Sequence, residues 1–199
     1  MGLFNKDKSG SGNEKNKLSL KAEFNQSAQQ IFGLVLDVEK YPKFIDALEA
    51  VNKTANGSND MTVEFVLSDD AYNEARSKVS EKLKSFSLPG VPNSLIEKMV
   101  PKKQTFKVTW NEFDHINVEN LDKPIDGMVS RWTFTPKDTG GTEVAFETDY
   151  NKTNFVVRKI LNLDFIQAVF KERNQETIDA VKKQADIIFN GNQDGPKGP

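Results

Sequence analysis

The feature that most constrains the fold is a change in the period of the apolar residues near position 154. Before it, apolar and polar side chains alternate in short runs, as in strands with one buried face. From Asn154 to Phe189 there is no proline or glycine, and apolar residues recur at helical spacing. The order predicts one α+β domain in which an antiparallel sheet packs against a long C-terminal helix.

Alternating runs predict a sheet of about six to seven strands. Leu18 to Phe24 forms the first, and three hairpins are expected further on because segments such as 56–60 (NGSND) and 138–141 favour tight turns. The remaining runs are 50–54, 61–67, 106–110, 116–118, 128–134 and 144–150.

Two short helices are expected between the first strand and the first hairpin. Asn25 or Ser27 can cap the first helix, which is expected to end near Asp37. Pro42 suits the first turn of the second helix, where its missing N–H would be unpaired anyway.

Residues 68–103 predict a helical insert. One face of its first helix is apolar, while lysine, arginine and glutamate occupy much of the rest. Asp69 and Asp70 are interpreted as capping residues of this helix rather than as cation ligands.

Composition argues against several classes of function. The chain has 27 Lys and Arg against 29 Asp and Glu, a net charge of -2, which lacks the basic excess typical of nucleic-acid binding. It contains no cysteine, which excludes disulfides and thiolate chemistry and is compatible with a cytoplasmic location. The polar segments 1–17 and 190–199 are predicted to be disordered, which leaves a domain over 18–189.

No catalytic, metal or cofactor site is predicted. The only histidine, His115, lies at an expected turn and is interpreted as a surface residue. Gly140 and Gly141 fall in a hairpin turn, so they are not read as a phosphate-binding loop.

Two segments resemble START-like (SRPBCC) domains, the polyketide cyclase and lipid-transport superfamily. Residues 24–44, FNQSAQQIFGLVLDVEKYPKF, resemble the opening of these domains, and residues 131–150 resemble their penultimate hairpin. The resemblance is nearest to the coenzyme Q-binding branch and the ribosome association toxin. It rests on the spacing of Phe32, Val35, Asp37, Val38, Tyr41, Pro42 and Phe44. The 68–103 insert departs from that branch.

The resemblance implies a helix-grip fold with a cavity between the concave sheet and the C-terminal helix. The side chains expected to line this cavity, from the strands and from the C-terminal helix, are the predicted ligand-binding residues: Phe65, Trp110, Trp132, Phe134, Phe146, Tyr150, Leu161, Phe165 and Val169. Entrance or lid positions are Tyr41, Pro42, Phe44, Val79, Leu83 and Phe86. The alternative is that these side chains simply fill a core, as apolar strand faces usually do.

The implied function is a carrier or chaperone for a lipid or an isoprenoid quinone such as ubiquinone, supporting respiratory electron transport. The first alternative is a cyclase- or dehydratase-like enzyme using Tyr150, Thr148 and Arg131. The second is a ribosome-associated interaction protein.

The surplus of apolar residues in the first half of the C-terminal helix also suggests peripheral membrane contact. Its basic candidates are Arg158, Lys159, Lys82, Lys84, Lys102 and Lys103.

Overall fold

The computed structural model describes residues 16–84, 98, 100–138 and 140–190. Of the ends predicted to be disordered, 1–17 and 190–199, only residues 16, 17 and 190 are therefore described, and Lys17 belongs to the first strand. Seven antiparallel strands form one sheet in the order β1-β7-β6-β5-β4-β3-β2. The strands are β1 (Lys17–Phe24), β2 (Leu48–Ala55), β3 (Asp60–Leu67), β4 (Lys103–Asn111), β5 (His115–Asn120), β6 (Val129–Pro136) and β7 (Thr142–Asp149). The helices are α1 (Ala28–Leu36), the 3-10 helix η2 (Val38–Lys43), α2 (Asp69–Lys84), α4 (Phe155–Leu161) and α5 (Asp164–Phe189).

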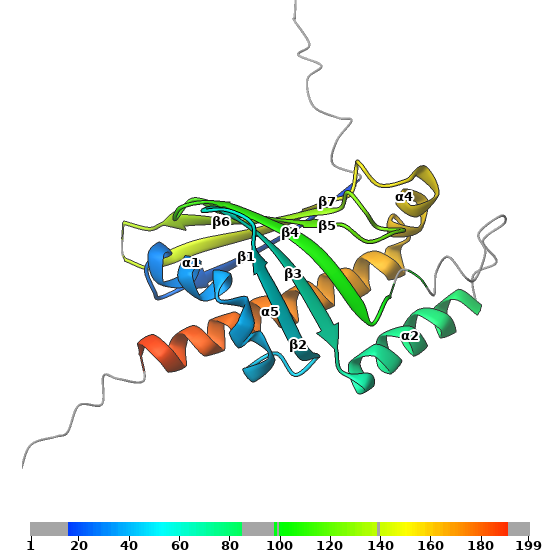
Figure 1. Cartoon of the computed structure of the whole chain (residues 1–199), viewed down its shortest axis with the longest axis horizontal. Coiled ribbons are helices and arrows are strands. Elements are labelled where there is room, and N and C mark those ends of the chain that lie inside the picture. Colours follow the sequence, from blue (N-terminus) through cyan, green and yellow to red (C-terminus); the bar gives the residue numbers. More distant parts are fainter. Residues whose placement is uncertain (1–15, 85–97, 99, 139, 191–199) are drawn as a thin grey trace, which may run out of the picture.

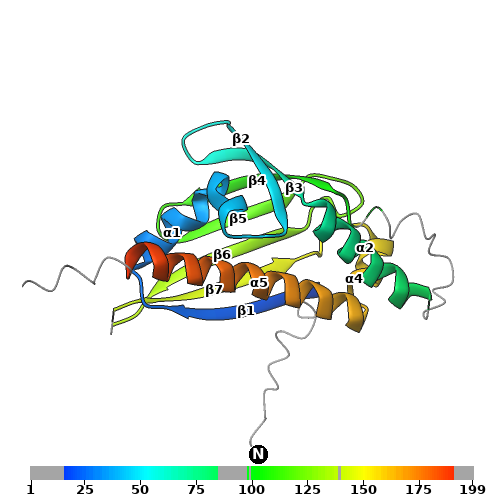
Figure 2. The same cartoon turned by 90° about the horizontal axis from the view of Figure 1, so that it is seen from below.

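The sheet curves around α5, which crosses the same face that α1 covers (Figures 1 and 2). The predicted α+β class and the three hairpins β2–β3, β4–β5 and β6–β7 are confirmed. β1 closes the sheet beside β7, with Leu20 opposite Phe146. Among the described residues, no helix combines the length and apolar character needed to span a membrane.

Local side-chain chemistry explains where the first helices begin. Ser27, rather than Asn25, caps α1, since the Gln30 N–H donates to Ser27 Oγ at 3.3 Å and the Ser27 N–H donates to Gln30 Oε1 at 2.9 Å. η2 follows directly after α1. Pro42 therefore stands near its end and not in its first turn as predicted; a short 3-10 helix tolerates the missing N–H there.

The prediction of one continuous helix over 154–189 is wrong, because α4 ends at Leu161 and α5 begins at Asp164. Asn162 terminates α4, and its backbone N–H donates to two carbonyls of that helix. Asparagine competes for backbone hydrogen bonds and favours helix ends, so the break needs neither proline nor glycine.

The buried apolar side chains form two clusters. The first lies between the sheet, α1, η2 and the C-terminal half of α5, which contributes Ile178, Val181 and Ala185. The second joins α2, α4 and the start of α5 around Ile160 and Ile166. The molecule therefore has two apolar centres, and the same long helix belongs to both.

Two adjacent glycines in the β6–β7 turn allow a matched test of how closely β1 approaches β7. Gly140 and Gly141 both have positive φ, at +79° and +84°, but only at Gly141 would a Cβ meet the Phe24 carbonyl oxygen, at 2.5 Å. We expect Gly141→Ala to lower the free energy of unfolding by roughly 2–4 kcal/mol and Gly140→Ala by about 1 kcal/mol. Urea denaturation measures both, and equal losses would contradict a rigid approach of the two strands.

Candidate functional site

The face of the sheet beneath α5 carries two neighbouring rows of side chains, which the strand register aligns. The first row is Trp110, Ile116, Trp132, Phe146 and Leu20. The second row is Met61, Val108, Val118, Ser130, Thr148 and Leu18. The first row is buried except at Trp110, whereas Val118, Ser130 and Leu18 of the second row stay half-buried.

Polar side chains interrupt this apolar face in and beside the second row. The hydroxyls of Ser130 and Thr148 lie 3.0 Å apart, and Thr148 is only 3 % exposed. Asn120 follows Val118 on the same face of β5 and is 1 % exposed. Asn120 Oδ1 accepts the Asp122 N–H at 2.9 Å, but its Nδ2 has no partner within the described part of the chain.

α5 is buried at both ends and less buried in its middle. Ile166 lies in the second cluster and Ile178 in the first, yet no residue from 167 to 177 is buried, over about three turns. The backbone of α5 contacts β1, α1 and α4. Phe170 and Asn174 share the helical face of Ile166 and Ile178, because they stand four or eight residues from them.

We call the area between the two clusters the central zone. Its sheet side is formed by Asn120, Ser130 and Thr148, with Phe106 and Val118 at the margin of the first cluster. Its helix side is formed by Asn174, with Phe170 at the margin of the second cluster. Asn174 Nδ2 is a second buried donor without a partner among the described residues.

The predicted ligand-binding residues fall around this zone. Trp132, Phe134 and Phe146 are buried in the first cluster, with Phe65 and Trp110 at its margin. Tyr150 and Leu161 are buried in the second cluster, with Phe165 at its margin, and half-buried Val169 belongs to neither cluster as described. Most therefore pack at the two ends, and their contact with a ligand stays a prediction. Six residues of the central zone were not among the predicted ligand-binding residues: Phe106, Val118, Asn120, Ser130, Phe170 and Asn174.

The predicted entrance residues lie in two groups. Tyr41 is buried: its hydroxyl donates to the Val35 carbonyl at 2.7 Å, and its ring stacks on Phe65 with centroids 6.1 Å apart. Half-buried Phe44 packs edge-on against Tyr41, and Pro42 is half-buried beside them. Val79 of α2 is buried in the second cluster. The Leu83 side chain and Phe86 lie outside what the structure describes.

The candidate enzyme residues are not brought together. Tyr150 OH donates to Asn162 Oδ1 at 3.0 Å and accepts from Gln167 Nε2 at 2.6 Å, which braces the break between α4 and α5. Burial raises the pKa of Tyr150, against the opposing effect of the Gln167 hydrogen bond. Arg131 is exposed on the face opposite Trp132, where its Nε donates to Asn117 Oδ1 at 2.7 Å. Arg131 therefore does not share a face of the sheet with Thr148, because successive strand side chains alternate in direction.

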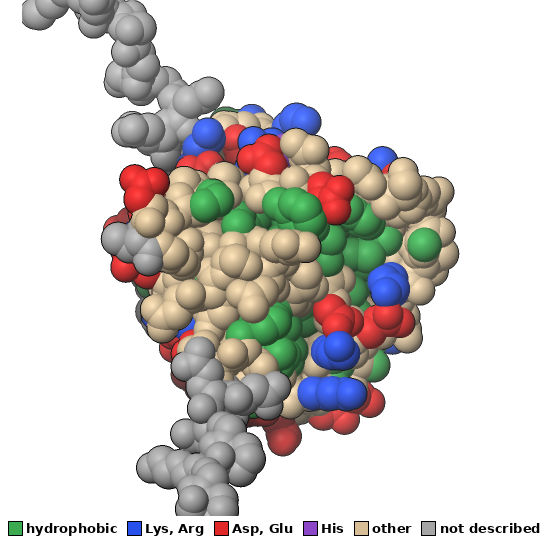
Figure 3. Space-filling model, turned by 90° about the vertical axis from the view of Figure 1, so that its left-hand side faces the viewer, with side chains coloured by type: hydrophobic (Ala, Val, Ile, Leu, Met, Phe, Trp, Pro, Cys, Tyr) green, Lys and Arg blue, Asp and Glu red, His purple; other side chains and the backbone are tan. Residues whose placement is uncertain are grey.

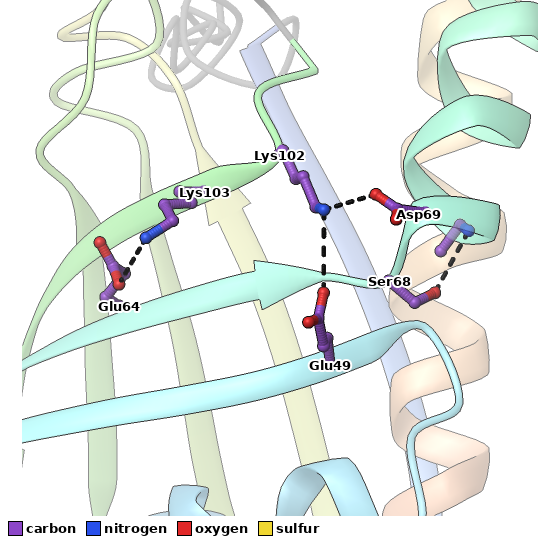
Figure 4. A network of polar contacts seen from close by, with 7 residues as sticks. Glu49, Glu64, Ser68, Asp69, Lys102 and Lys103 are labelled. Atoms are coloured by element: carbon purple, nitrogen blue, oxygen red, sulfur yellow. Dashed lines mark hydrogen bonds and ion pairs between the residues drawn. The ribbon is translucent and has the colours of Figure 1, made fainter.

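A polar network attaches the first turn of α2 to the sheet (Figure 4). Ser68, not Asp69 or Asp70, caps the helix, since the Ala71 N–H donates to Ser68 Oγ at 3.3 Å. Lys102 pairs with Asp69 and lies 3.8 Å from Glu49, and the hydrogen bond to Asp69 raises the pKa of Lys102. The same region pairs Lys103 with Glu64 at 3.6 Å. Lys102 and Lys103, two of the six basic residues proposed for lipid headgroups, therefore already have acidic partners.

His115 is half-buried at the start of β5, where its Nδ1 lies 2.8 Å from Asp114 Oδ2. This contact is the main cause of a lowered pKa of Asp114. Within the described ranges, no group of three or more histidine, cysteine, aspartate or glutamate side chains is placed to hold a metal ion.

Comparison with known proteins assigns the family. Residues 25–181 match the family described as polyketide cyclase/dehydrase and lipid transport. The chain belongs to this family. The chain matches no curated protein. Family and fold suggest a START/polyketide cyclase-like protein that binds a hydrophobic ligand.

Solved structures share the fold at low sequence identity. The Zhui aromatase/cyclase from Streptomyces sp. R1128 is 14 % identical over 86 % of this chain and 93 % of that chain, with a TM-score of 0.59. An 18 kDa protein from Caulobacter crescentus is 14 % identical over 87 % and 98 %, with a TM-score of 0.55. A START superfamily protein from Mycobacterium smegmatis is 12 % identical over 85 % and 97 %, with a TM-score of 0.53. These likenesses confirm the START-like fold.

The buried hydroxyl of Tyr41 predicts how the stability of the protein changes with pH. Burial raises the pKa of Tyr41 well above the usual value of about 10, so the folded state holds this proton more tightly than the unfolded chain. The stabilisation is fully present below pH of about 10 and is lost as the pH rises further. We expect Tyr41→Phe to be less stable at pH 8, because it loses the hydrogen bond to Val35, but to decline less steeply above pH of about 10. Urea denaturation across this range measures both slopes, and parallel curves would contradict the prediction.

Proposed function

We propose that the protein binds a hydrophobic small molecule in the central zone and acts as its carrier or chaperone. The observation that carries this proposal is the stretch 167–177 of α5, in which no residue is fully buried although it lies between the parts of the helix that enter the two buried clusters. A helix that only closed a core would bury its inward face along its whole length. A ligand with an apolar body would supply the missing contacts.

A lipid or an isoprenoid quinone such as ubiquinone fits this zone best. The family description includes lipid transport, which supports a carrier. The alternative is a cyclase- or dehydratase-like activity, because a solved structure with a similar fold is an aromatase/cyclase. The carrier is favoured because Tyr150 is held in a bracing network and Arg131 lies on the other face of the sheet.

Mass spectrometry of organic extracts tests the carrier proposal directly. We expect protein purified without detergent to contain a stoichiometric lipid or quinone, and Val118→Trp to lose most of it, because an indole in the second row would fill the central zone. Glu119→Trp is the matched control, since the next residue of β5 points to the opposite face. Equal ligand content in both variants, or an empty wild type, would contradict the proposal.

The end of the molecule that carries α4 supports a second part of the proposal, a contact with anionic membranes. Phe155 is 61 % exposed, and Val156 and Leu121 are also exposed at this end, where β5 and β7 both finish. Lys159 Nζ lies 4.5 Å from the centre of the Phe155 ring. Exposed apolar side chains beside a lysine suit an interface with acidic headgroups, where a carrier would exchange its ligand.

Flotation with anionic liposomes tests this contact. We expect Phe155→Ser/Val156→Ser to weaken liposome binding about tenfold, because two apolar side chains no longer enter the interface. The matched control is Ile187→Ser/Ile188→Ser at the opposite end, where hydrophobic groups lie among acidic and basic side chains (Figure 3). Wild-type protein that stays entirely unbound would refute the membrane contact and leave the carrier proposal standing.

A further inference from the structure

We infer that the central zone selects a neutral ligand with a hydrogen-bond acceptor oxygen, such as a carbonyl, on an otherwise apolar body. The donors would be Asn120 and the Ser130–Thr148 pair. The inference rests on the proposed function and specifies the chemical class of its ligand.

The Asn120 side-chain amide has a fixed orientation, and only its oxygen has a hydrogen-bond partner among the described residues. Its Oδ1 accepts the Asp122 N–H, which fixes which end of the amide is nitrogen. Its Nδ2 is buried, carries two hydrogens and has no acceptor in the described part of the chain. Leaving a buried donor unpaired is costly, and a ligand oxygen in the central zone would remove that cost.

The hydroxyls of Ser130 and Thr148 supply a further donor, because together they have one more hydrogen than their mutual hydrogen bond uses. Ser130 and Thr148 carry two O–H groups, and either one can donate to the other across 3.0 Å. One hydrogen is used in that contact, and the remaining one has no acceptor among the described residues. Ser130 stands opposite Val118, two residues before Asn120 on the same face of β5, so the donors are neighbours.

The surroundings favour a neutral acceptor over a carboxylate. Neither the second row nor the other members of the central zone include a lysine, arginine, aspartate or glutamate. Arg173, which precedes Asn174 on α5, lies 3.4 Å from the Glu176 carboxylate. Burying a free carboxylate without a paired cation is expensive, whereas a quinone, ketone or ester oxygen carries no such cost.

Competitive loading tests the inference. Full-length protein is equilibrated with equal amounts of decylubiquinone, decylbenzene and decanoate, which share a ten-carbon chain, and the ligands retained after gel filtration are quantified by mass spectrometry. We expect Ser130→Ala/Thr148→Val to lower the retained ratio of decylubiquinone to decylbenzene roughly three- to tenfold relative to wild type. Asn120→Asp, which keeps the oxygen bonded to Asp122 and removes the N–H donors, should act in the same direction. Ser19→Ala/Thr133→Val, on the opposite face, should leave the ratio unchanged.

The outcomes separate this inference from the proposed function. An unchanged ratio in folded variants that still retain ligands would overturn the inference and leave the carrier intact. Decanoate retained as well as decylubiquinone would overturn the preference for a neutral head. Wild-type protein that retains none of the three would refute the carrier, and the inference with it. Thermal melts of each variant confirm that the compared proteins are folded.

Discussion

The anchoring of α5 at its two ends is the constraint on which the rest of the structure depends. Ile178, Val181 and Ala185 are almost completely buried against the sheet and α1, and Ile166 is buried against α4 and α2. A helix spans its two anchors as a nearly straight rod, while the sheet below it curves. This difference in shape accounts for the lower burial of residues 167–177, where the central zone lies.

Much of the fold follows from periodicity, and the exceptions have local causes. The alternating runs place all seven strands, because a side-chain period of two survives even where single positions are polar. The break at Asn162 is invisible to the same reasoning, because apolar spacing hardly changes across two residues. Asparagine favours a helix end, and the Tyr150 hydroxyl stabilises this one by donating to Asn162 Oδ1.

The site was harder to predict than the fold. The aromatic residues could be predicted from the alternation of side chains along each strand, which puts Trp132 and Phe146 on the same face. Polar members of that face are ambiguous in a sequence, because serine or asparagine in a strand usually faces water. Only the register brings Ser130 beside Thr148, and only burial reveals that Asn120 keeps an unused donor. The alternation of Ile116, Val118 and Asn120 was the one available signal.

The same residues favour the proposed carrier over the alternative of an enzyme. Acid–base catalysis needs a group that exchanges a proton near the working pH and reaches the substrate. Burial raises the pKa of both Tyr41 and Tyr150, which moves them away from that range, and each hydroxyl is already engaged by the protein. The unused groups are amide and hydroxyl donors, which orient an oxygen without exchanging protons. In the proposed complex, the apolar walls and the donors without a partner among the described residues would hold the ligand in one orientation, and its affinity would depend on the oxygen that the ligand brings.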